Sequence, residues 1–259
     1  TIEPEQKMTL MSFDFWQFSK AETNKFYLIG IDTASASGND SSSIVVFDYE
    51  TFHQVAEFKG KLRVDEFCKI ISLVNRIYPN NLIVPEANSY GNQVCEYLTK
   101  GDVFYNIYQT KIKSTTTAPT GKPKFKYGIT TGPQNRPLMI DALYTYVTED
   151  PSIVRSERLA LELIGLVDNG NGKIMADEGE QDDLALATSF CAYVRLYDPP
   201  LGVSRDMQSQ SVLDDMSDVS RWNDNIRNPN SPELSELKNI LPTVDRIDGL
   251  EHANKLLNK

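Results

Sequence analysis

The sequence has 259 residues, with 26 Lys and Arg against 36 Asp and Glu, which gives a formal net charge of −10. It lacks the ~18 consecutive apolar residues of a transmembrane helix and the apolar core of a signal peptide, so neither segment is expected. The three cysteines form no CxxC pair and only two histidines are present, which leaves little material for a disulfide framework, a thiolate zinc site or a Ser-His-Asp triad. A bound metal is therefore expected to have oxygen ligands, as Mg²⁺, Mn²⁺ or Ca²⁺ do.

The hydrophobic pattern predicts alternating strands and helices. Three strands of an antiparallel meander come first, followed by an amphipathic helix with apolar residues at helical spacing. In chain order we predict strands at 26–31, 43–48 and 55–62, a helix at 64–78, a strand at 81–85, a helix at 92–99, a strand at 103–110, helices at 137–147 and 156–166, a short strand at 173–176 and a buried helix at 183–197. This order predicts an α/β fold with a mixed central sheet and helices on both faces.

Acidic residues flank three of these elements. Asp32 directly follows the apolar strand FYLIGI, Glu86 follows NLIVP, and Asp182 and Asp183 precede or open the buried helix. If the two strands are parallel neighbours, their carboxyl ends lie at one edge of the sheet, where open α/β sheets place active sites. Carboxylates gathered there repel one another unless cations lie between them. Two Mg²⁺ or Mn²⁺ ions, ~3.5–4 Å apart, would suit hydrolysis at phosphorus, one activating water and the other stabilising the leaving 3′ oxygen.

Each acid also has a structural interpretation. Asp182 or Asp183 alone suits an N-cap or a partner of the helix dipole, and Asp32 suits a turn in the Ser- and Gly-rich loop that follows it. Glu86 precedes Ala-Asn-Ser-Tyr-Gly and has no capping role that the sequence indicates. The conjunction of these acids in one α/β order favours a shared site over independent accidents.

A basic segment lies inside this acidic chain. Residues 103–140 contain no Asp or Glu, and their Lys and Arg residues are Lys111, Lys113, Lys122, Lys124, Lys126 and Arg136. A segment this basic inside an acidic protein indicates an anionic partner at that place, and we expect it to form a basic hairpin. The structural alternative is a solvated hairpin whose lysines discourage edge pairing.

Three motifs together resemble the nuclease domain of the terminase large subunit, the DNA-packaging motor protein of tailed bacteriophages. They are IGID ending at Asp32, VPEANSYG around Glu86, and ADEGEQDDLAL around Asp182 and Asp183. The resemblance covers roughly residues 26–197 and implies a ribonuclease-H-like fold, two-metal catalysis and cleavage of concatemeric double-stranded viral DNA in the cytoplasm of an infected bacterium. It implies that Asp32, Glu86 and one or both of Asp182 and Asp183 are catalytic metal ligands.

The same family carries a packaging ATPase domain ahead of the nuclease, and no P-loop motif occurs in this sequence. The ATPase domain is therefore expected in a missing N-terminal part of the same chain, or the chain is a stand-alone nuclease. On the first reading residues 1–24 are an interdomain connector, 25–197 the nuclease domain and 198–259 a polar C-terminal extension. The resemblance implies double-stranded DNA, the portal and the small terminase subunit as partners. With this resemblance, the basic residues of 103–140 are expected to contact DNA backbone phosphates, which gives affinity without sequence reading. The lack of a long apolar segment predicts no membrane partner.

Other interpretations stay open at this point. A Holliday-junction resolvase or a transposase-like nuclease would use similar acids on the same fold. The chain could also be a non-catalytic assembly module of a packaging motor, although the complete set of acids argues against a degenerate site.

Overall fold

The computed structural model describes residues 1–36, 40–100, 105–112, 124–168, 174–176 and 181–200. The chain divides into two compact units, Thr1–Pro199 and Pro200–Lys259. The described residues belong to the first unit, apart from Pro200. The expected polar extension from residue 201 onward lies outside the described residues, as does part of the basic segment.

The main sheet has six strands in the order β1-β2-β5-β4-β3-β6. β3 and β6 pair in parallel, whereas the other neighbouring strands of this sheet pair antiparallel. The elements are β1 Gln6–Leu10, β2 Phe13–Gln17, β3 Tyr27–Asp32, β4 Ser42–Asp48, β5 Gln54–Gly60, α1 Val64–Ile77, β6 Asn81–Pro85, α2 Gly91–Lys100, β7 Gln109–Ile112, β8 Lys124–Tyr127, α3 Arg136–Glu149, the 3₁₀ turn η1 Pro151–Ile153, α4 Glu157–Ile164, β9 Leu166–Asp168, β10 Ile174–Ala176 and α5 Asp183–Tyr197.

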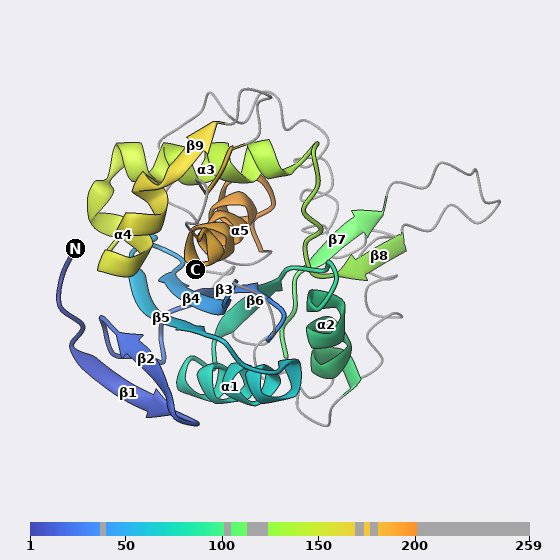
Figure 1. Ribbon diagram of the computed structural model, residues 1–259, viewed down its shortest axis with the longest axis horizontal. Coiled ribbons are helices and arrows are strands. Elements are labelled where there is room, and N and C mark those ends of the chain that lie inside the picture. The colour runs from blue at the N-terminus through green and yellow to red at the C-terminus, as the bar shows by residue number, and fades with distance from the viewer. Residues whose placement is uncertain (37–39, 101–104, 113–123, 169–173, 177–180, 201–259) are drawn as a thin grey trace, which may run out of the picture. The chain divides into compact units, whose positions relative to one another are not determined.

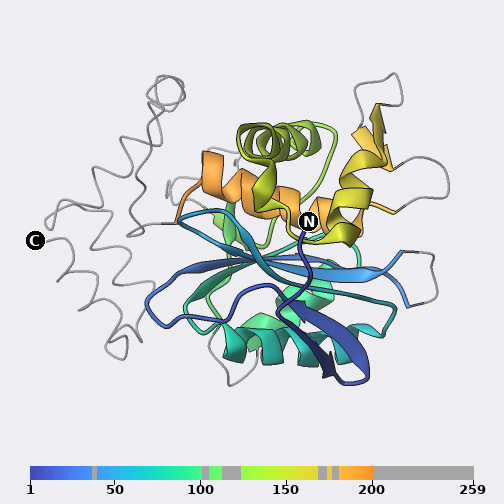
Figure 2. The ribbon, with the colours of Figure 1, turned by 90° about the vertical axis from the view of Figure 1, so that its left-hand side faces the viewer.

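Helices cover both faces of the sheet. α1, with α2 beside it, packs on one face, while α5 lies on the other face and carries α3 and α4 against its outer side (Figures 1 and 2). The apolar face of α1 is buried through Phe67, Ile70, Ile71 and Val74, as its helical periodicity predicts. The predicted α/β fold with a mixed central sheet is therefore confirmed.

The packing of α5 on the sheet depends on one glycine. A Cβ atom at Gly30, in the middle of β3, would lie 2.1 Å from the backbone oxygen of Ala187 in α5. Only a residue without a side chain permits this approach of helix backbone to strand backbone. α5 is buried nearly all round, as its sequence predicts, and Gly30 lets the α5 backbone at Ala187 lie directly against β3.

The N-terminal residues contain two strands that the sequence analysis did not predict. β1 and β2 form a hairpin with Leu10 opposite Phe13, and β2 pairs with β5, so that the hairpin extends the sheet at one edge. Phe15 of β2 is fully buried in the core. The role of residues 1–24 as an interdomain connector stays a prediction.

The segment after α2 also differs from its prediction. Residues 103–110 were expected to be one strand, but β7 begins only at Gln109. Before β7, the described residues make one parallel bridge to β6, between Ile107 and Ile83. In this bridge the Ile83 N–H donates to the Asn106 carbonyl oxygen, and the Tyr108 N–H donates to the Ile83 carbonyl oxygen. The basic hairpin expected after residue 110 is present as the antiparallel pair β7–β8. In the described part of the chain, no helix combines the length and the apolar character needed to cross a membrane.

Candidate active site

Strand pairing places Asp32 in a row of polar residues on one side of the sheet. Asp32, the last residue of β3, lies opposite Ser43 of β4, and Ser43 lies opposite Lys59 of β5. Directly opposed residues in a sheet project to the same face. The Ser43 hydroxyl donates to the backbone oxygen of Asp183, 2.8 Å away, so this row faces the first turn of α5.

Glu86 lies beside Asp32 because β3 and β6 are parallel neighbours. The backbone N–H of Glu86 donates to the carbonyl oxygen of Ile31 at 2.9 Å, which continues the β3–β6 ladder by one residue. The Glu86 Oε1 atom accepts hydrogen bonds from the Asn88 amide, at 3.1 Å, and from the Thr131 hydroxyl. The acid and the asparagine of the VPEANSYG motif therefore contact each other, and their bond fixes the glutamate side chain.

The glycine of the same motif holds the chain against Glu86. Gly91 is the first residue of α2, and a Cβ atom there would lie 2.0 Å from the Glu86 carbonyl oxygen. Since real Cβ contacts are essentially never below 3.0 Å, the tight return of the chain into α2 requires glycine. The motif thus encodes the backbone position of Glu86 as well as its carboxylate.

Asp182 and Asp183 lie at the N-terminus of α5 and are each engaged by a cation. The Arg136 Nη2 atom lies 2.6 Å from Asp182 Oδ2. The Lys59 Nζ atom lies 3.2 Å from Asp183 Oδ2, and the same oxygen accepts the Ser41 backbone N–H at 3.1 Å. Asp182, the N-cap residue, makes no side-chain cap bond to its helix, so its N-capping interpretation gains no support here.

The four acids are close enough to perturb one another. Burial raises the pKa of Asp32 well above its usual range, and the negative charges of Glu86, Asp183 and Asp182 raise it further, together with a hydrogen bond to Glu86. Burial also raises the pKa of Asp183, although Lys59 opposes the shift. Strand pairing thus makes Asp32 and Glu86 neighbours, and the Ser43 contact places Asp183 near the same row, whereas a shared catalytic metal site of the four acids stays a prediction.

The donor chemistry of this cluster suits hard divalent cations, because all its ligand atoms are oxygens and its carboxylates outnumber the neighbouring cations. Among the described residues, however, no group of three or more His, Cys, Asp or Glu side chains is arranged to hold a metal ion. Two of the four carboxylates are turned onto Arg136 and Lys59 instead. The chemistry of these residues therefore fits divalent ions. In this structure, however, the Arg136 and Lys59 side chains pair with two of the carboxylates that an ion would need as ligands.

The basic hairpin adjoins the acidic cluster. Ile129, just after β8, forms a parallel bridge with Glu86. Lys111 in β7 is exposed and pairs with Phe125, while Lys126 donates to the carbonyl oxygen of Ala87 at 2.9 Å.

The remaining basic candidates are less fully described. Lys113 and Lys122 lie outside the described residues, as does the side chain of Lys124. Arg136 lies at the start of α3, in the acidic cluster rather than in the hairpin. Phosphate binding by the six basic residues stays a prediction.

The structure adds charged residues that the sequence analysis missed. Glu162 of α4 lies 2.5 Å from Lys59 through Oε1 and accepts the Ala185 backbone N–H through Oε2 at 2.9 Å. Lys59 and Glu162 are distant in sequence, and neither forms part of a motif. Two charged residues on one face of β5, Glu57 and Lys59, were the available signal, since charges on a buried strand imply partners.

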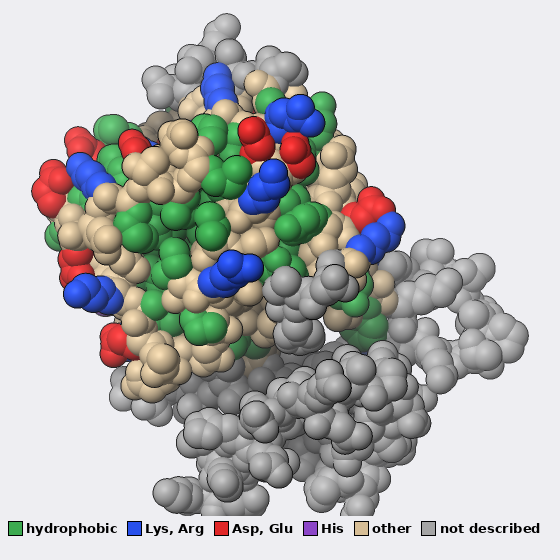
Figure 3. All heavy atoms as spheres, turned by 90° about the horizontal axis from the view of Figure 1, so that it is seen from below, with side chains coloured by type: hydrophobic (Ala, Val, Ile, Leu, Met, Phe, Trp, Pro, Cys, Tyr) green, Lys and Arg blue, Asp and Glu red, His purple; other side chains and the backbone are tan. Residues whose placement is uncertain are grey.

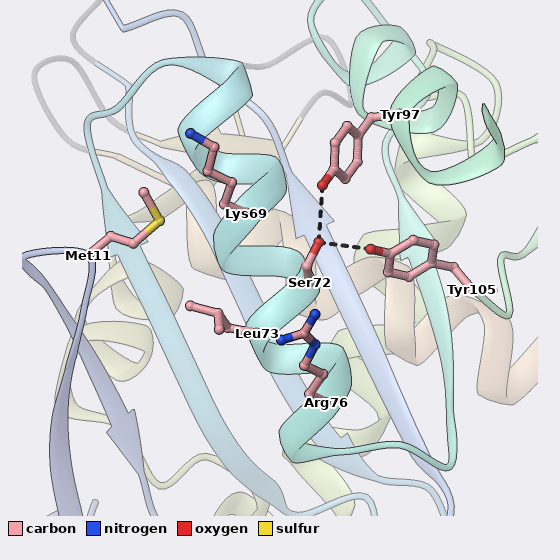
Figure 4. Close-up of a pocket in the computed structure, with 7 residues that line it drawn as sticks. All are labelled: Met11, Lys69, Ser72, Leu73, Arg76, Tyr97 and Tyr105. Atoms are coloured by element: carbon pink, nitrogen blue, oxygen red, sulfur yellow. Dashed lines mark hydrogen bonds between the residues drawn. The ribbon is translucent and has the colours of Figure 1, made fainter. Parts of the chain in front are cut away.

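A surface hollow of about 360 Å³ lies elsewhere, on the helical layer that covers the opposite face of the sheet. The Ser72 hydroxyl lies at its centre, 2.8 Å from the Tyr105 hydroxyl and 3.4 Å from that of Tyr97 (Figure 4). The lining residues are Met11, Lys69, Ser72, Leu73, Arg76, Tyr97 and Tyr105. Seen from the α1 side, hydrophobic, basic and acidic side chains are interspersed (Figure 3), so the described residues visible on this face form no single-sign patch for a polyanion.

The fold and the acidic cluster define a ribonuclease-H-like α/β domain. Models of protein families and curated proteins give no match to the sequence. Among solved structures, the chain is similar to the large terminase nuclease of thermophilic phage G20c. The structure with bound magnesium matches with a TM-score of 0.53 and 13% identity, and the structure with bound cobalt with a TM-score of 0.54 and 14% identity. Each match covers 74% of this chain and 90% of the G20c chain. The large terminase nuclease domain of Thermus phage P74-26 matches with a TM-score of 0.51 and 14% identity, over 76% and 90% of the two chains. The fold is therefore that of the large terminase nuclease domains, as the sequence motifs predict.

Proposed function

We propose that this chain is a divalent-metal-dependent endonuclease that cleaves double-stranded viral DNA during genome packaging, in the cytoplasm of an infected bacterium. The observation that carries the proposal is that Asp32 and Glu86 end adjacent parallel strands, next to the first turn of α5 with Asp182 and Asp183, in a fold shared with large terminase nucleases. The magnesium and cobalt in the phage G20c structures support the use of divalent ions here.

In this proposal the four carboxylates hold two Mg²⁺ or Mn²⁺ ions, which supply Lewis acidity to both the attacking and the leaving oxygen of an in-line displacement. The protein contributes the positions of the ligands. Asp32 and Glu86 are fixed by adjacent parallel strands, and Asn88 and Thr131 orient Glu86. Hydrogen bonds from neighbouring groups of this kind commonly set the geometry of first ligands.

The basic hairpin supplies contacts to the DNA in the same proposal. Lys111, Lys113, Lys122, Lys124, Lys126 and Arg136 bind backbone phosphates, which carry no sequence information, so cleavage has little sequence specificity. The packaging ATPase domain, the portal and the small terminase subunit are the proposed protein partners. Their binding would bring DNA to a domain whose net negative charge opposes it.

The test is cleavage of plasmid, linear and four-way-junction DNA with Mg²⁺, with Mn²⁺ and with EDTA. We expect metal-dependent cleavage of plasmid and linear DNA without preference for the junction. Asp32→Asn, Glu86→Gln and Asp183→Asn should each abolish cleavage while the protein stays folded. Asp65→Asn, an exposed site on α1, is the matched control and should cleave like the wild type.

Four results would contradict the proposal in different ways. Full activity of Asp32→Asn would refute the assignment of the site. Cleavage confined to four-way junctions would favour a resolvase, and end joining would favour a transposase-like enzyme. The absence of both Mn²⁺ binding and cleavage in the wild type would favour an assembly module.

A further inference from the structure

Lys59 lies between two buried carboxylates, one of which, Asp183, belongs to the candidate site. Its Nζ atom is 2.5 Å from Glu162 Oε1 and 3.2 Å from Asp183 Oδ2. The exposed fractions of the three side chains are 15% for Lys59, 8% for Glu162 and 6% for Asp183. With so little solvent around it, the ammonium group is screened weakly and acts strongly on nearby charges.

Glu162 holds Lys59 in this place. One Glu162 oxygen binds the ammonium group and the other accepts the backbone N–H of Ala185 in the first turn of α5. Glu162 comes from α4 and is not one of the four candidate metal ligands. Lys59 therefore has a partner of its own, and its position does not depend on Asp183 alone.

The position of Lys59 bears directly on metal binding. The ammonium group neutralises Asp183, which the proposed function assigns to a divalent ion. Lys59 also lies in the same cross-strand row as Asp32, separated from it by Ser43. A positive charge fixed beside an acidic cluster disfavours a second cation there by direct repulsion.

We propose that Lys59 is a built-in counter-ion of Asp183, with which a divalent ion must compete, so that Lys59 weakens metal binding in the absence of DNA. This inference rests on the proposed function, since that function makes Asp183 a metal ligand. Lys59 is a positioning residue in this scheme and not a catalytic one.

The experiment measures Mn²⁺ binding to the full chain without DNA, from the electron paramagnetic resonance signal of free Mn²⁺. The informative variant is Lys59→Met combined with Glu162→Gln, which removes the ammonium group and its partner charge together. The double change leaves the net charge around the site unaltered. We expect its Kd for Mn²⁺ to fall roughly tenfold or more, because the ammonium group that lies 3.2 Å from Asp183 Oδ2 no longer competes for that oxygen. Lys59→Arg keeps the charge and should stay near the wild-type Kd, as should Lys61→Met, an exposed lysine two residues along the chain.

Thermal unfolding without metal separates this electrostatic role from a structural one. Lys59→Met alone should lower Tm, because it leaves two buried carboxylates without their cation. The double variant should recover only part of the loss, because Glu162→Gln removes one of those charges and Asp183 keeps the other. If the double variant is folded but binds Mn²⁺ as the wild type does, or more weakly, Lys59 has only a structural role and the proposal is overturned.

The outcome for the proposed function is read separately. Wild-type Mn²⁺ binding that is lost in Asp183→Asn supports the ligand assignment, whatever the Lys59 variants show. If neither the wild type nor any Lys59 variant binds Mn²⁺, both the counter-ion role and the metal-dependent function are wrong.

Discussion

Gly91→Ala perturbs the backbone around Glu86 without touching a charged group. The new Cβ atom would lie 2.0 Å from the Glu86 carbonyl oxygen and 2.9 Å from its carbon. Because such contacts are essentially never below 3.0 Å, the start of α2 and Glu86 must separate by about 1 Å. The neighbouring backbone resists this shift, since the N–H groups of Glu86 and Ala87 are bonded to Ile31 and Ile129.

The cost of this shift can be estimated for folding and for cleavage. Overpacking of this kind typically costs about 1–3 kcal/mol. At about 2–4 °C per kcal/mol for a domain of this size, Tm should fall by roughly 2–12 °C. A displacement of about 1 Å at a reacting group can lower a rate by about 100-fold, so cleavage should fall much further than the folded fraction does.

The assay compares Tm with the rate of plasmid cleavage at saturating Mn²⁺ and at a temperature where the variant is fully folded. Gly132→Ala is the control, because the nearest atom to its new Cβ would be the Asn135 side-chain oxygen, 3.7 Å away. It should match the wild type in both measurements. A Gly91→Ala protein with wild-type Tm and wild-type cleavage would refute the reasoning, since the contact would then be relieved without moving Glu86.

Three further predictions concern packing, pH and DNA binding. Arg158→Met should lower the free energy of unfolding by about 3–5 kcal/mol, because it removes the guanidinium group that lies 2.7 Å from the fully buried Glu57. Calorimetry should show that adding Glu57→Gln recovers most of this loss. Burial raises the pKa of the Cys68 thiol from 9.0 to about 11. Between these pH values the folded chain keeps a proton that the unfolded chain loses, so the free energy of unfolding should fall as the pH rises. In denaturant titrations, Cys68→Ala should make this pH dependence less steep. Lys111→Glu should lower DNA cleavage and reduce its salt dependence. The control Lys69→Glu, at an exposed position on α1, should change neither. Equal salt dependence in the two variants would count against DNA binding by the hairpin.

Local sequence patterns are sufficient for the elements that carry the acids. The apolar runs before Asp32 and Glu86 predict buried strands, and the apolar character around the whole of 183–197 predicts the buried helix α5 with its observed bounds. These signals depend on residues close together in sequence, which is why they are readable. Their convergence needed one further condition, the parallel pairing of β3 and β6, and the structure confirms it.

The N-terminal hairpin was missed because its turn lacks the usual residues. Two-residue hairpin turns require positive φ angles and usually contain Asn or Gly. Here the turn consists of Met11 and Ser12, with φ angles of 50° and 74°. Phe13 and Phe15 then look like isolated aromatic residues of a connector, although they alternate on strand β2.

Long-range ion pairs were missed for a different reason. Lys59 and Glu162 are 103 residues apart. No local sequence pattern predicts that the face of β5 with Lys59 packs against the face of α4 with Glu162. Once the fold is known, two pairs follow the same order along β5 and α4, with Glu57 on Arg158 and Lys59 on Glu162. Pairing of this kind becomes visible only when the register of the elements is fixed.

The glycines of the acidic motifs explain how packing and chemistry are linked. Gly30 lets the α5 backbone approach β3, and Gly91 lets α2 begin against Glu86. Each contact is made by backbone atoms, which cannot adjust by changing rotamer as side chains do. Because α5 carries Asp183 and β3 ends at Asp32, the Gly30 contact lets the two elements that carry these acids pack closely together. The motif residues beside each acid therefore determine the geometry of the cluster, while the acids themselves supply its charge.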